Sequence, residues 1–198
     1  MATGWINVAK AGNDLADLLD GLTDEQLAAP SLSEGLSVLE AAGLFASLLQ
    51  ITPFKLIVGM AKHRGDDEAF FAKNAKKLSD SGVESIANIL RENSGKTAKG
   101  VTEAAMVTVA AVQTVNITRS LGIDSVLDPE VMTIALDATA DELTERLGED
   151  APRLEATDSD WARGDGPIIR GTSDVLLLAL GDNILVEELE GEGVSLLP

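Results

Sequence analysis

An apolar segment from Ser37 to Ile51 constrains the fold of this chain more than any other feature. It is apolar on nearly every side of a helix, which is typical of a helix buried inside a bundle. A second long apolar segment runs from about Val101 to Leu121, and Gly122 follows it as a helix terminator. Because neither helix can be stable with that surface exposed, the sequence predicts a bundle of packed helices.

The rest of the first 150 residues adds shorter segments with apolar residues at helical spacing. The first runs from Trp5 to Leu22, and the last begins at Asp128-Pro129-Glu130, a cap, proline and acid in the order of a helix start, and ends near Gly148. Between them we expect helices over 54–60, 66–78 and 83–90. Residues 1–150 are therefore predicted to form one helical bundle.

The pattern changes after residue 150. Leu154, Ala156 and the region of Trp161 suit extended chain, a turn follows at 164–167, and Ile168 begins a second short strand. A small hairpin is the simplest interpretation, and residues 173–180 return to a helical pattern. We expect residues 151–198 to be a small α/β extension packed on the bundle, so the predicted fold class is mainly α.

The formal charge of −18 is concentrated near the C-terminus, where residues 123–198 hold 19 acidic and 4 basic side chains. Such a surface repels phosphate backbones, so we expect no nucleic-acid binding. Solubility is the simplest explanation of the charge, and an acidic docking surface or a salt-adapted source are the alternatives.

Cysteine is absent, which excludes disulfides, a thiolate nucleophile and a thiolate metal site. The N-terminus lacks a basic segment followed by an apolar run, and no apolar stretch approaches the roughly 18 residues that span a bilayer. We therefore expect a cytoplasmic protein that does not bind a membrane.

Four stretches of the chain form an ordered set of motifs. They are Leu22–Gln26 leading to Pro30-Ser31, Glu34–Val38, Ile117–Gly122, and Gly164–Gly171 followed by Leu176–Leu180. In their order and spacing they resemble the mycothiol-dependent maleylpyruvate isomerase family of the DinB-like superfamily. The resemblance covers nearly the whole chain and implies a DinB-like four-helix bundle with a small α/β C-terminal extension.

This family usually binds a divalent metal that polarises a substrate or a low-molecular-weight thiol. The resemblance implies three ligands, a histidine on the second helix and a glutamate and histidine four residues apart on a later one. Here the corresponding residues are Leu44, Val109 and Gln113. Leucine and valine cannot bind a metal, and an amide oxygen alone is a poor zinc ligand. Three further family positions also differ, at Leu36, Leu39 and Asn116. We therefore expect neither a metal nor another cofactor.

Gln113 and Asn116 lie three residues apart on an otherwise apolar helix, on a face that includes Met106 and Val109. We predict that the two amides are the catalytic groups, acting as hydrogen-bond donors, and that Leu44, Met106 and Val109 line the substrate pocket. The alternative is structural, because buried amides also bond to each other, to the backbone or to water.

His63 is the only histidine. It lies between two cations at a predicted helix end, where its simplest role is to interact with the terminal carbonyls.

Two functions remain open. One is a metal-independent isomerase, cyclase or transferase of specialised metabolism that positions a small organic substrate, with or without a low-molecular-weight thiol. The other is a catalytically silent small-molecule-binding or scaffold protein. We expect a monomer or homodimer in either case.

Overall fold

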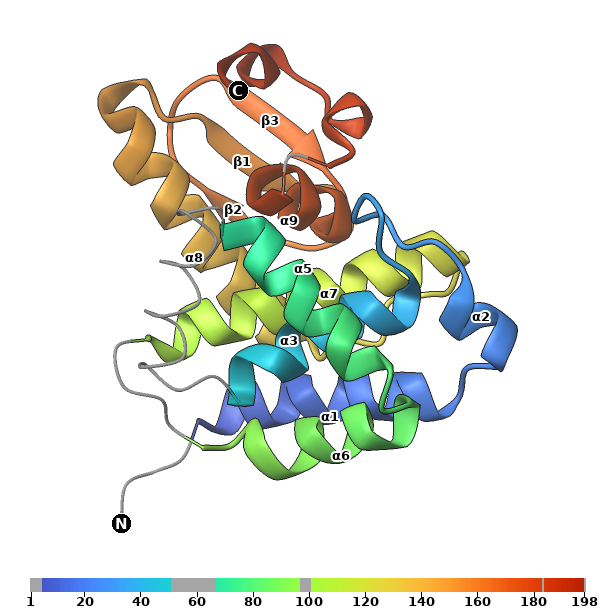
Figure 1. Cartoon of the computed structure of the whole chain (residues 1–198). Coiled ribbons are helices and arrows are strands. Elements are labelled where there is room, and N and C mark those ends of the chain that lie inside the picture. The colour runs from blue at the N-terminus through green and yellow to red at the C-terminus, as the bar shows by residue number, and fades with distance from the viewer. Residues whose placement is uncertain (1–4, 51–66, 97–100, 183, 198) are drawn as a thin grey trace. The chain divides into compact units, whose positions relative to one another are not determined.

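The computed structural model describes residues 5–50, 67–96, 101–182 and 184–197. Contacts between backbone positions divide the chain into two compact units, Met1–Asp128 and Pro129–Pro198. Each unit has its own elements and its own buried side chains, so the two are described separately (Figure 1).

Four helices of the first unit form a closed ring of neighbours. They are α1 (Ile6–Asp20), α6 (Val83–Asn93), α3 (Val38–Gln50) and α7 (Glu103–Leu121), and each packs against the next, with α7 returning to α1. A fifth helix, α5 (Asp67–Ser79), lies across α3 (Figure 1). The predicted four-helix bundle is therefore present.

Helix starts in this unit follow from short polar sequences. In α2 (Asp24–Ala28) the Thr23 side chain accepts a hydrogen bond from the Gln26 N–H, and the Gln26 side chain accepts one from the Thr23 N–H. Ser37 and Glu40 exchange the same pair of bonds at the start of α3. Reciprocal bonds of this kind satisfy N–H groups that have no partner within the helix.

Small residues let the helices of the first unit approach closely. A Cβ atom at Gly43 would lie 3.0 Å from the Ala75 carbonyl oxygen, so α3 and α5 meet backbone to backbone at that point. A Cβ atom at Gly12 would overlap the side chain of Ser94, which donates to the Leu90 carbonyl. The buried interior is otherwise almost wholly aliphatic, and Phe45 is its largest fully buried side chain.

The second unit pairs two helices with a small sheet. Its helices are α8 (Pro129–Leu147) and α9 (Ser173–Asp182), and its strands are β1 (Arg153–Ala156), β2 (Ala162–Arg163) and β3 (Ile168–Gly171). The strand order is β2-β1-β3, with β1 antiparallel to β2 and parallel to β3. The predicted strand at 168–170 is present, but its predicted hairpin pairing is wrong. The strand that forms a hairpin with β1 is β2. The chain then crosses to the other edge of β1, where β3 lies parallel to it.

Polar contacts and close backbone approaches hold this unit together. The Trp161 indole N–H donates to the Asp137 carboxylate at 3.0 Å, and Arg163 pairs with Asp141 at 2.7 Å, so β2 is tied to α8. The C-terminal segment exchanges two backbone hydrogen bonds with β3, between Arg170 and Glu190. Gly191 has φ +113° and faces the Ile168 carbonyl, where a Cβ atom would collide with it.

The predicted mainly α fold class, with a bundle and a small α/β C-terminal unit, is confirmed. The predicted helix at 54–60 lies outside the described residues. In the structure α8 belongs to the compact C-terminal unit, whereas the predicted boundary places residues 129–150 in the bundle. The domain boundary after residue 150 stays a prediction. Among the described helices, none is long and apolar enough to cross a membrane.

Candidate functional site

Helix α7 carries the two amides predicted to form the site. Its first turn is capped by Thr102, whose hydroxyl accepts from the Ala105 N–H at 3.1 Å, and it ends at Gly122 in the left-handed conformation with φ +64°. Every residue from 110 to 118 is buried, so this stretch of α7 has no solvent-facing side. Gln113 and Asn116 lie within the stretch, on adjacent turns of one face.

Asn116 is fully buried, and its amide is bonded to the loop between α2 and α3. Its Oδ1 accepts from the Leu32 N–H at 2.9 Å, and its Nδ2 donates to the Ser33 hydroxyl at 2.7 Å. The structural alternative of a bond to the backbone is therefore observed at this residue. The catalytic role predicted for Asn116 stays a prediction.

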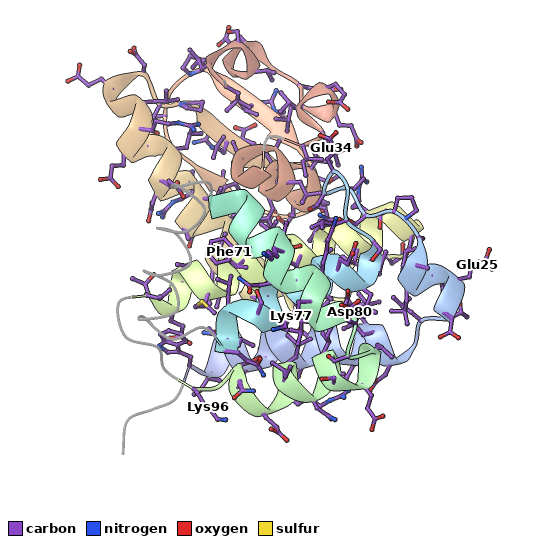
Figure 2. The ribbon with its side chains drawn as sticks, in the orientation of Figure 1. Glu25, Glu34, Phe71, Lys77, Asp80 and Lys96 are labelled. Atoms are coloured by element: carbon purple, nitrogen blue, oxygen red, sulfur yellow. The ribbon has the colours of Figure 1, made fainter. Side chains whose placement is uncertain are left out.

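The loop that Asn116 holds, residues 31–36, is closed by its own hydrogen bonds. The Ser31 hydroxyl donates to the Leu36 carbonyl at 3.0 Å, and the Ser31 N–H donates to the same carbonyl at 2.9 Å. Glu34 is exposed at the tip of the loop (Figure 2), and Leu36 is buried. The sequence-based predictions give no role to Leu32 or Ser33, although two serines so close to a proline indicate a structured turn.

Gln113 differs from every other buried polar side chain in the described part of the first unit. It is 6% exposed, and its Oε1 is buried without a hydrogen-bond partner. The others each make at least one hydrogen bond: Ser47, Ser94, Thr114, Asn116 and Thr118. A half-turn of the Gln113 amide would present its N–H donors at the same place, so the site can offer an acceptor or a donor.

The three predicted pocket residues lie on the two helices expected to form the site. Leu44 is on α3 and Met106 and Val109 are on α7, and these helices pack against each other. Met106 is buried, whereas Leu44 and Val109 are partly exposed. An open groove of about 450 Å³ lies elsewhere, along α6. It is lined neither by these three residues nor by Gln113 or Asn116.

The donors at the expected ligand positions do not fit a metal ion. Leu44 and Val109 have no lone pair to offer, and Gln113 supplies one neutral amide. Over the ranges that the structure describes, no cluster of three or more histidine, cysteine, aspartate or glutamate side chains could hold an ion instead. His63 lies outside those ranges. The ligand set implied by the family resemblance is therefore not reproduced at these positions.

Two described carboxyl groups, Glu155 in the second unit and Asp14 in the first, have shifted pKa values. The hydrogen bond from Arg153, followed by that from Arg170, lowers the pKa of the Glu155 carboxyl, and both contacts are 2.7 Å. Arg170 thus pairs with a local acid, as its surroundings in the sequence suggest. Burial raises the pKa of Asp14, whose carboxylate accepts from the Asp128 N–H at 3.4 Å. Neither carboxyl group is among the predicted site residues.

Comparison with known proteins finds similarity to solved structures. Two matching chains are described as the mycothiol-dependent maleylpyruvate isomerase and a mutant of it, with TM-scores of 0.46 and 0.47. Each match has 12% identity and covers 95% of this chain and 91% of the other. No family model and no curated protein matches the chain. Membership of that family and the activity of this chain therefore stay predictions.

Proposed function

We propose that this chain binds a small organic substrate against the buried amide of Gln113 and acts on it without a metal ion. The observation that supports the proposal is the unpartnered Gln113 Oε1. A buried polar group without a partner costs about 1–3 kcal/mol, and all its counterparts in the described bundle are satisfied. A ligand with a matching polar group removes that cost when it binds.

The chemistry that one amide supports is positioning and charge stabilisation. An amide N–H aimed at a carbonyl oxygen stabilises the negative charge that develops there during enolisation or acyl transfer. Holding the substrate in one orientation lowers the barrier further. In this proposal the enzyme is an isomerase, cyclase or transferase, Gln113 contacts the substrate, and Asn116 acts as a positioning residue through the 31–36 loop.

The wider setting follows from the sequence resemblance. A DinB-like protein related to the mycothiol-dependent maleylpyruvate isomerases would act in the cytoplasm, in specialised metabolism, as a monomer or homodimer. A low-molecular-weight thiol such as mycothiol is then the natural second ligand. The loss of donors at Leu44 and Val109 supports a reaction that differs from the metal-assisted one.

The test is a thermal-shift screen of neutral and ionised organic fragments against wild-type protein and two variants. Gln113→Leu removes the amide, and the matched control Thr114→Val alters a buried polar group that already bonds to the Ala110 carbonyl. A fragment at 100 times its Kd stabilises by about 2.7 kcal/mol, or roughly 5–10 °C. We expect such a shift in wild type and Thr114→Val, and its loss in Gln113→Leu. Equal shifts in all three would contradict the proposal.

A catalytically silent binding protein is the second candidate. The observation in its favour is that both the oxygen and the nitrogen of the Asn116 amide are hydrogen-bonded to the 31–36 loop, which leaves fewer polar groups to act on a substrate. Incubation with maleylpyruvate and mycothiol, followed by proton NMR, tests turnover of the family's substrate directly. Binding in the fragment screen without conversion of any bound compound would favour the silent binder.

A further inference from the structure

We infer that the part of the ligand that reaches Gln113 is electrically neutral and carries one hydrogen-bonding group on an apolar body. This inference rests on the proposed function and specifies its substrate class. It follows from three properties of the described interior: the absence of buried charge, the occupation of the other polar groups, and the apolar character of the neighbouring positions.

The first property concerns charge. Among the residues whose side-chain burial the structure describes, no aspartate, glutamate, lysine, arginine or histidine is buried, and the buried polar groups are hydroxyls and amides. An ion transferred into such surroundings loses its hydration without gaining a counter-charge, which costs several kcal/mol. A dicarboxylate such as maleylpyruvate would bring two negative charges to an interior in which no described cation is buried. A neutral group avoids this penalty.

The second property concerns the number of polar contacts on offer. The Asn116 amide bonds to Leu32 and Ser33, and the Thr114 and Thr118 hydroxyls donate to the Ala110 and Val115 carbonyls of their own helix. These groups are already satisfied. Gln113 alone on α7 combines burial with an unpartnered polar atom among the described side chains. The site therefore matches a ligand with a single polar group.

The third property concerns the surroundings on α7. The positions one turn before and after Gln113 on its face include Val109, Ala110 and Ile117, and Met106 lies one turn further. These four are apolar, and the polar neighbour Asn116 already bonds to Leu32 and Ser33. The flexible methionine side chain can adapt to ligands of different outline. A hydroxyl, phenol or amide attached to a hydrocarbon body fits this environment, since its polar group meets Gln113 and the rest meets apolar side chains.

Three probes of one shape test the inference. Toluene has no polar group, 4-methylphenol is neutral at pH 7, and 4-methylbenzoate is ionised at that pH. Each is titrated into full-length, nitrogen-15-labelled protein, and the side-chain amide signal of Gln113 is followed by NMR. The signal is assigned by its absence from Gln113→Leu.

We expect 4-methylphenol to move the Gln113 signal saturably and to bind about threefold to tenfold more tightly than toluene, which is the usual effect of one net hydrogen bond. The preference should vanish in Gln113→Leu and persist in Thr114→Val. At the same concentration 4-methylbenzoate should leave the signal unmoved.

The alternative outcomes separate the two proposals. If 4-methylbenzoate moves the signal as strongly as 4-methylphenol, the ligand need not be neutral, and this inference is overturned while the Gln113 site stands. If no probe moves the signal and the amide keeps a cross-peak to a bound water, Gln113 is a hydrated structural residue. That result overturns both the inference and the proposed function.

Discussion

Replacing Gln113 with leucine should leave the ligand-free protein as stable as wild type or make it more stable, which is unusual for a buried polar residue. The substitution removes a group that pays for its burial without a described partner, a cost of about 1–3 kcal/mol. Leucine does not fill the whole volume of glutamine, and the gap that it leaves destabilises the fold by about 1 kcal/mol. The free energy of unfolding should therefore rise by about 0–2 kcal/mol.

Thr114→Val provides the contrast on the same helix. Thr114 is fully buried, and its hydroxyl donates to the Ala110 carbonyl at 2.9 Å. Valine keeps the shape and loses this bond, so the free energy of unfolding should fall by about 0.5–1.5 kcal/mol. The two neighbouring substitutions thus have opposite expected signs, although both replace a buried polar side chain with an apolar one.

Urea unfolding at 25 °C, followed by far-UV circular dichroism, measures both changes, with equal m-values as the check that the unfolded states are comparable. In thermal melts each kcal/mol corresponds to about 2–4 °C for a chain of this size. A loss in Gln113→Leu equal to or larger than that in Thr114→Val would refute the reasoning. It would show that Gln113 has a partner, such as a buried water, that stabilises the fold.

Four other outcomes are expected. Asn116→Leu should destabilise the protein by about 2–3 kcal/mol and speed hydrogen exchange of the Leu32 amide, because it leaves two partly buried groups of the 31–36 loop without their bonds to Asn116. Ser33→Ala should cost only about 1 kcal/mol. Gly191→Ala should lower the melting temperature more than Gly148→Ala, since both have positive φ but only Gly191 faces a backbone carbonyl within reach of a Cβ atom; equal losses would contradict the close approach. The folded pKa of Glu155 is lowered, so its ion pairs stabilise the fold above its ordinary pKa of 4.5 and are lost as the pH falls through the lowered value. The urea midpoint of Glu155→Gln should therefore drop less between pH 7 and pH 3 than that of wild type. Purified protein should contain no stoichiometric zinc by elemental analysis, and a chelator should leave its melting temperature unchanged; tight one-to-one zinc would contradict the interpretation of Leu44 and Val109 as lost ligands.

The long helices were predictable because their apolar residues extend over many positions and their ends carry recognisable residues. The apolar segment ending at Gly122 became α7, and the cap, proline and acid order at Asp128 became the start of α8. The five-residue α2 was missed, since it is too short to show a period, although its Thr23 and Gln26 capping pair is present in the sequence.

Partners across long distances were not predictable. Local patterns identify strands but not their neighbours, so β3 was expected in a hairpin and instead lies parallel to β1. The same limit applies to the two amides. Their shared face followed from helical spacing. The loop that bonds to Asn116, however, comes from a segment more than 80 positions earlier. Whether Gln113 finds a hydrogen-bond partner depends on all the side chains packed around it, which the sequence does not identify.

The Asn116 contact also has a consequence for the order of folding. The Leu32 N–H and the Asn116 Oδ1 are 84 positions apart, and α3, α5 and α6 lie between them in the chain. Contacts of such long range form late, because the intervening chain must first be brought together. The 31–36 loop should therefore become ordered only after α7 has docked, and it should be the first part of the described bundle to open when α7 loosens. Docking of α7 is then the step that fixes the loop in place, through the two ends of the Asn116 amide.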